Sequence, residues 1–135
     1  MEQLQKEIES KSQDYCDIVS RFSAFLTEEN EALRAYDIKK VGSMLDNKAH
    51  IVGAYRSIVG YFIKNQAEIK TLNEQRQQEM KELSQKLEAL MKENDVLLNN
   101  IAKKATDASS TSYSSGGKYS KVDNTRSAMA INQTL

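Results

Sequence analysis

Apolar residues recur at helical spacing throughout residues 1–105, and this stretch contains no proline. The steps are three, four or seven residues, as one face of an α-helix requires. Strand-like alternation of apolar and polar residues is absent. The clearest sets are Leu4, Ile8, Tyr15, Ile18 and Phe22, then Met44, Ile51, Tyr55, Ile58 and Phe62, and then Met80, Leu83, Leu87, Leu90 and Leu97. The pattern predicts an all-α chain.

One unbroken helix of this length would extend ~150 Å, so breaks are expected. Asp37 is suited to cap a helix N-terminus, and Thr71 followed by Glu74 fits a capping box. We therefore expect helices over 3–35, 37–68 and 72–105. They would form an antiparallel bundle of three long helices with a flexible C-terminal tail.

The apolar faces can be aligned across the two expected turns. A turn near 36–37 places Tyr15 opposite Ile58, and a turn near residue 70 places Ile51 opposite Leu90. Burying a large side chain in such layers contributes ~1.5–3 kcal/mol, which makes the layers the main stabilising contribution.

Three glycines lie within the second expected helix, at Gly42, Gly53 and Gly60. Each costs ~1 kcal/mol relative to alanine, which disfavours an extended dimeric coiled coil. The glycines fall on one helical face. That face is either a shallow groove for a partner helix or an exposed back face that tolerates small residues.

Composition changes near residue 105. Residues 106–117 are mostly Ser, Thr and Gly, and such a stretch has too little apolar surface to offset its ordering entropy. We expect a helical bundle over 1–105, a flexible linker over 106–117 and a C-terminal tail over 118–135.

Charge and residue usage exclude several functions. Nineteen basic residues balance nineteen acidic ones, so we expect neither nucleic acid nor an anionic membrane as the main partner. One Cys and one His are too few for the usual zinc site, and we expect no metal, cofactor or catalytic residue. Apolar runs are far shorter than the ~20 residues that span a bilayer. We expect a cytoplasmic protein without direct membrane insertion.

The third expected helix has an unusually broad apolar face. Excess apolar width on a bundle helix is typical of a docking surface for an amphipathic helix, although the other two helices could also cover it. The candidate substrate-binding residues are Leu90, Met91, Leu97, Leu98 and Ile101.

The tail carries a weaker apolar pattern that includes Met129 and Ile131, with Ala128 and Leu135 at helical spacing. One or two isolated helical turns are marginal in water. The segment either folds onto a partner, which makes Met129 and Ile131 candidate substrate contacts, or remains an unstructured terminus.

The order of these elements resembles the FlgN-type flagellar export chaperones. The stretch from Leu26 through Glu29, Ala32-Leu33 and Asp37 is similar to that family's Leu-x-x-Glu, Ala-Leu and Asp pattern. Further similarities are Val41, Met44-Leu45 and Lys48, then Asn94 with Leu97-Leu98-Asn99, and finally Tyr113-Ser-Ser-Gly-Gly117, which resembles a Tyr-Gly-x-x-Gly element.

The resemblance implies a cytoplasmic export chaperone of the flagellar type III secretion system. Such proteins bind helical terminal segments of hook-associated proteins and deliver them to the export gate at the membrane. The resemblance assigns gate docking to Tyr113 and Gly117. The alternative from the residue pattern is a coiled-coil adaptor that self-associates through the same apolar stripes.

Overall fold

The computed structural model describes the backbone of residues 2–108 and the side chains of residues 3–105. Over this range every regular element is an α-helix, so the all-α prediction is confirmed. Most of the predicted linker, the tail, and the candidate residues Tyr113, Gly117, Met129 and Ile131 lie outside the described residues. The helices are α1 (Glu2–Arg34), α2 (Ile38–Ser43), α3 (Leu45–Lys64), α4 (Gln66–Ile69) and α5 (Glu74–Ala108).

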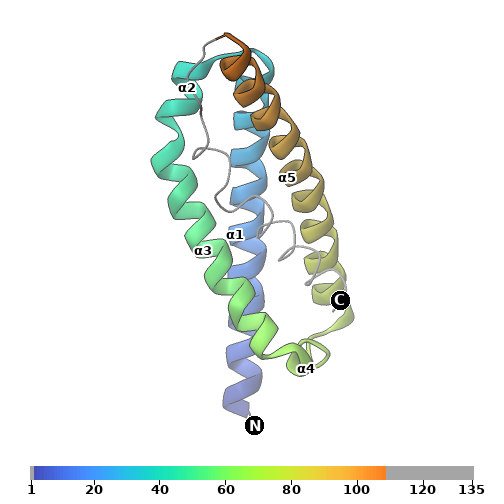
Figure 1. The fold of residues 1–135 in the computed structure, drawn as a ribbon. Coiled ribbons are helices and arrows are strands. Elements are labelled where there is room, and N and C mark those ends of the chain that lie inside the picture. Colours follow the sequence, from blue (N-terminus) through green and yellow to red (C-terminus); the bar gives the residue numbers. More distant parts are fainter. Residues whose placement is uncertain (1, 109–135) are drawn as a thin grey trace.

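The three long helices lie side by side, with α1 packed against both α3 and α5 (Figure 1). The short α4 connects α3 to α5 at the end where α1 begins, and α2 lies at the opposite end. Gln13 contacts Arg76 and Asn30 contacts Glu93, each pair separated by 63 residues. A constant separation shows that α1 and α5 run parallel.

The side chains of α1 and α5 that face inward alternate in steps of four and three, and all of them except Leu98 and Ile101 are buried. This is the a/d spacing of a heptad repeat, in which each inward side chain packs between side chains of the facing helix. The α1 positions are Ile8, Ser12, Tyr15, Val19, Phe22, Leu26, Glu29 and Leu33, and the α5 positions are Met80, Ser84, Leu87, Met91, Asn94, Leu98 and Ile101.

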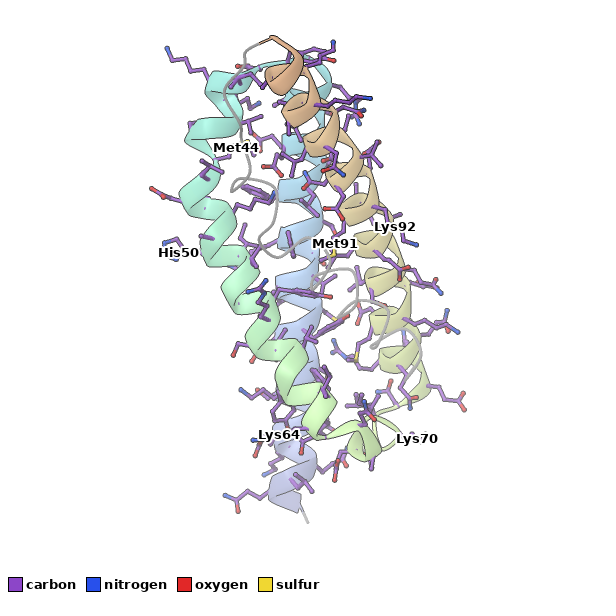
Figure 2. The ribbon with its side chains drawn as sticks, viewed as in Figure 1. Met44, His50, Lys64, Lys70, Met91 and Lys92 are labelled. Atoms are coloured by element: carbon purple, nitrogen blue, oxygen red, sulfur yellow. The ribbon has the colours of Figure 1, made fainter. Side chains whose placement is uncertain are left out.

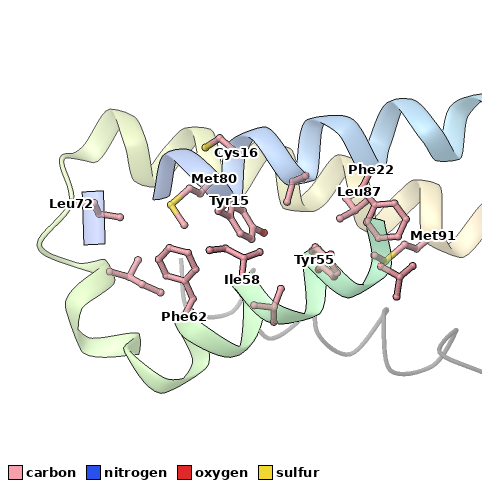
Figure 3. Packing of buried hydrophobic residues seen from close by; sticks show 14 of the residues in the cluster. Tyr15, Cys16, Phe22, Tyr55, Ile58, Phe62, Leu72, Met80, Leu87 and Met91 are labelled. Atoms are coloured by element: carbon pink, nitrogen blue, oxygen red, sulfur yellow. The ribbon is translucent and has the colours of Figure 1, made fainter. Parts of the chain in front are cut away.

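Two aromatic pairs join α1 to α3 in the core (Figure 3). The rings of Tyr15 and Phe62 meet edge to face with centroids 5.7 Å apart, and those of Phe22 and Tyr55 lie 5.4 Å apart. The sequence analysis placed Tyr15 opposite Ile58, which is one helical turn away. That register is wrong because the turn between the helices is longer than expected.

The predicted single helix over 37–68 is interrupted twice. Asp37 caps α2 as expected, since its Oδ1 accepts a hydrogen bond of 3.1 Å from the Lys40 N–H. The helix is interrupted at Met44 and again at Asn65, whose φ and ψ angles are not helical. The first break moves α3 relative to α1 and accounts for the shift in register.

The predicted capping box at Thr71 and Glu74 is also wrong. The Asn73 Oδ1 accepts a hydrogen bond of 2.7 Å from the Arg76 N–H, which makes Asn73 the N-cap of α5. The Thr71 hydroxyl instead donates to the carbonyl of Glu68, at the end of the preceding turn.

Candidate functional site

Four buried polar side chains from three helices meet near one end of the molecule. They are Glu29 and Asn30 of α1, Lys48 of α3 and Asn94 of α5, with exposed fractions of 1, 0, 8 and 4%. Burying a charge is costly unless it is paired and hydrogen-bonded. We call these four residues the polar layer.

The polar layer is closely connected. The Lys48 Nζ lies 3.0 Å from Glu29 Oε1 and donates to Asn94 Oδ1 at 3.2 Å. The Asn94 amide nitrogen donates to Glu29 Oε1 at 2.7 Å and to Asn30 Oδ1 at 2.8 Å. Each ionised group therefore has both an opposite charge and an amide partner, the condition under which a buried pair is tolerated.

A second set of contacts connects the polar layer to the surface. The Asn30 amide nitrogen donates to Glu93 Oε1 at 2.9 Å and to the carbonyl of Leu90 at 3.3 Å. The other oxygen of Glu93 lies 3.0 Å from Arg34 Nη1. These hydrogen bonds join α1 to α5 directly and hold the two helices in one register.

The polar layer divides the apolar interior. The main core lies on the α4 side and extends from Ile8 to Leu26 along α1. Ala32, Leu33 and Met44 are buried as well but lie outside that core. The smaller apolar group stands next to α2, where the helical packing is least complete.

The end of α1 explains this incompleteness. Tyr36 has a positive φ of 56°, its N–H bonds to the Leu33 carbonyl, and the Asp37 N–H bonds to the Ala32 carbonyl. This is the Schellman arrangement that terminates a helix, here with tyrosine at the position usually held by glycine. The chain then enters α2, none of whose residues is buried.

Helix α5 continues beyond the end of α1. Leu98 and Ile101 occupy a/d positions but are only partly buried, as is the adjacent Leu97. Tyr36 and Ile38 are 51 and 54% exposed. The Lys104 Nζ lies 4.2 Å from the centroid of the Tyr36 ring, which places this tyrosine beside α5. We call Tyr36, Ile38, Leu97, Leu98 and Ile101 the α2/α5 end surface.

The candidate residues from the sequence separate into three groups. Leu97, Leu98 and Ile101 lie on the α2/α5 end surface. Leu90 is partly buried and packs against the core, and Met91 is 4% exposed within the core (Figure 3). Met91 thus lies in the core of the free chain, and its role as a substrate contact stays a prediction, as does that of Leu90.

The two residues with potentially reactive side chains, Cys16 and His50, lie on different helices. Cys16 is buried in α1, where its Sγ lies 3.5 Å from both Arg76 Nη1 and Glu79 Oε1. Burial raises the pKa of this thiol, which opposes nucleophilic reactivity. His50 is exposed on the outer side of α3 (Figure 2). Among the described residues, no His, Cys, Asp and Glu side chains group in a way that could hold a metal ion.

The small-residue face of the second expected helix is open. A Cβ added at Gly42, Gly53 or Gly60 would meet no atom within 4 Å.

Within residues 2–108, no helix combines the length and the apolar content needed to cross a membrane.

Comparison with known proteins gives no relative. No family model matches the chain, and neither the curated proteins nor the solved structures contain a match.

Sequence reasoning missed the polar layer. It noted Glu29, Lys48 and Asn94 only as parts of a family-like pattern and assigned them no contact. A signal was present, because Glu29, Lys48 and Asn94 all occupy inward positions of their helices. Polar residues at such positions commonly fix register and partner choice.

Proposed function

We propose that this chain is a cytoplasmic export chaperone of the flagellar type III secretion system. In this proposal it forms an antiparallel three-helix bundle that binds helical terminal segments of hook-associated proteins. It then delivers them to the export gate at the membrane. Leu97, Leu98 and Ile101 are the proposed substrate contacts, together with Met129 and Ile131 of the tail.

The observation that carries the proposal is the convergence of the residues on which the family resemblance rests. Glu29, Lys48 and Asn94 are far apart in the sequence but contact one another in the polar layer. The backbone N–H of Asp37, from the same pattern, donates to the Ala32 carbonyl where α1 ends. Residues of the pattern thus gather at the end of α1, next to the turns of α5 that are only partly buried.

The α2/α5 end surface suits an amphipathic helix. A helix that packs apolar side chains against Leu98 and Ile101 would complete the a/d layers that α1 leaves unfinished. Burial of five or six large apolar side chains would contribute ~8–15 kcal/mol before costs. Ordering an unassembled segment removes several kcal/mol of this gain, which leaves binding tight enough for capture and weak enough for release.

Docking at the export gate is assigned to Tyr113 and Gly117. A tyrosine in a Ser/Gly-rich segment offers a large apolar ring and a hydroxyl with little rotamer entropy to lose. Tyr113→Ala should weaken affinity for the soluble domain of the gate by ~2 kcal/mol, as removal of a central aromatic anchor does. Calorimetric titration with substrate-loaded protein measures this, and equal affinities would remove Tyr113 from the mechanism.

The test of substrate binding compares two substitutions on α5. Leu98→Asp places a charge on the α2/α5 end surface, whereas Val96→Asp places the same charge at a site that is already 57% exposed. We expect Leu98→Asp to abolish binding of a hook-associated terminal segment and Val96→Asp to leave it intact. Circular dichroism checks that both variants remain helical. Equal binding by the two variants would place the site elsewhere.

The heptad pattern of α1 and α5 favours one alternative, a coiled-coil adaptor that self-associates. Sedimentation velocity over a range of concentrations separates the two functions. A compact monomer supports the chaperone, and an elongated dimer supports the adaptor.

A further inference from the structure

We propose that the chain's own C-terminal segment, residues 128–135, covers the α2/α5 end surface in cis when no partner helix is bound. A partner helix would displace this segment. The inference depends on the surface and not on the identity of the partner, so it stands or falls separately from the proposed function.

The first argument is the unfinished packing at this end. Below the polar layer, the inward positions of α5 are enclosed, as Leu87 is with an exposed fraction of 0%. Beyond it, Leu98 and Ile101 keep the same a/d spacing but are only partly buried. Two or three apolar side chains from another segment would complete these layers.

The second argument is the place where the chain leaves the described structure. Helix α5 ends at Ala108, at the same end of the molecule as α2 (Figure 1). The distance along α5 from Leu97 to Ala108 is only ~16 Å at the helical rise per residue. Residues 109–135 are thus tethered beside the surface that we propose they cover.

The third argument is the sequence of the tethered segment. Residues 109–127 are dominated by Ser, Thr, Gly and charged residues. Ala128, Ile131 and Leu135 follow in steps of three and four, and Met129 adds a further apolar side chain next to Ala128. This spacing is the one that the α2/α5 end surface would accept from an amphipathic helix.

The tether favours the cis arrangement. A chain of this composition over residues 109–127 has a root-mean-square span of ~22–26 Å, enough to return along α5 to Leu97. A tether of this kind gives an effective concentration in the millimolar range. A contact with a Kd of about 1 mM would then be formed in roughly half of the molecules, although it would be negligible between separate chains at micromolar concentration.

A second copy of the chain is the weaker candidate for this surface. A stable interface buries ~800 Å² on each partner. The α2/α5 end surface consists of five side chains, three of which are already partly buried, so it offers less area than a stable dimer needs.

The test uses the full chain with one tryptophan. The sequence contains no Trp, so Leu135→Trp gives a single reporter in the proposed segment. If the segment is docked, its emission lies at shorter wavelength than that of free tryptophan, and acrylamide quenches it less. Adding Leu98→Asp should shift the emission to longer wavelength and raise quenching, whereas adding Val96→Asp should change neither.

A variant within the segment controls for the possibility that Leu98→Asp acts by unfolding the helices. Met129→Asp with Ile131→Asp alters only residues 109–135 and should release the tryptophan as Leu98→Asp does. Emission at the wavelength of free tryptophan in the Leu135→Trp protein alone would overturn the proposal. So would emission that returns to that wavelength on dilution, because a cis contact is independent of concentration and a contact with a second copy is not.

Discussion

The two halves of α5 have the same heptad pattern and different surroundings. Leu87 lies fully enclosed between α1 and α3, whereas Leu98 remains partly exposed beside α2. The difference comes from where α1 ends and not from the sequence of α5. An apolar stripe is buried where the neighbouring helices continue beside it and partly exposed where they stop, and the polar layer lies between these two parts of α5.

The largest expected effect is at this boundary. Lys48→Met leaves the Glu29 carboxylate buried without its opposite charge, which should lower the free energy of unfolding by ~3–5 kcal/mol. Urea denaturation measures the loss. Lys92→Met is the matched control, because Lys92 pairs with Glu88 but its side chain is 60% exposed and points away from the helices (Figure 2).

The control should change the free energy of unfolding by ~1 kcal/mol or less, because the Lys92 charge lies largely in water even though the side chain of its partner Glu88 is only 16% exposed. Replacing both charges, with Glu29→Leu and Lys48→Met, should recover much of the loss since no unpaired charge remains. Equal effects of Lys48→Met and Lys92→Met would show that the polar layer is not a stability determinant.

The next effect compares the two halves of α5 directly. Leu87→Ala removes a fully enclosed side chain and should cost ~2–5 kcal/mol through lost burial and a cavity. Leu98→Ala should cost less than half as much, because its side chain still contacts water. Thermal and urea denaturation of both variants test this, and equal losses would place Leu98 in the core.

The sequence predicts where the long helices lie in the chain but not how they align with one another. Helical spacing predicted Tyr15 and Tyr55 as inward residues, which they are. It paired Tyr15 with Ile58 and not with Phe62, because a shift of four residues presents the same helical face. The length of the turn decides between such registers. The helix interruptions at Met44 and Asn65 could not be predicted from the sequence, because neither has a proline or a glycine with positive φ.

A smaller effect concerns a buried hydroxyl in the main core. The Tyr55 Oη is buried, and no group among the described residues forms a hydrogen bond with it. Tyr55→Phe should therefore raise the free energy of unfolding by ~1 kcal/mol at neutral pH, since it removes an unsatisfied polar group and keeps the ring contact with Phe22. A loss of stability would mean that the hydroxyl makes a favourable contact.

The same residue determines the behaviour at alkaline pH. Burial raises the pKa of both Tyr15 and Tyr55 above their ordinary value near 10. Above pH ~10 the unfolded chain releases these protons and the folded chain retains them, so stability falls as pH rises, by up to ~1.4 kcal/mol per pH unit for each group. Burial also raises the pKa of Tyr61, so Tyr55→Phe should remove one of several contributions and make that slope shallower in urea titrations between pH 10 and 11.

The smallest effect lies on the outer face of α3. Gly60→Ala should raise the free energy of unfolding by ~0.5–1 kcal/mol, because the added Cβ meets no atom and alanine is the better helix former. Differential scanning calorimetry measures the rise in Tm. A fall would mean that a close approach at Gly60 matters.

The candidate site was only partly accessible to sequence reasoning. The broad apolar face of α5 predicted Leu97, Leu98 and Met91 as substrate contacts; the structure leaves Leu97 and Leu98 partly exposed and buries Met91 in the core. Periodicity reports which side of a helix is apolar and not how far its neighbours extend. The exposure of Tyr36 and Ile38 depends on where α1 ends, which the sequence analysis placed correctly to within one residue without predicting its consequence.

Native-state hydrogen exchange along α5 tests the division of the molecule most directly. The amides of Met80–Ser84 and of Leu98–Ala102 stand at equal distances from the two ends of the helix, so fraying affects them alike. The account predicts that Met80–Ser84 exchange only through global unfolding, and that Leu98–Ala102 exchange through local opening at a clearly lower free energy. Equal protection of the two segments in the absence of a partner would contradict the account.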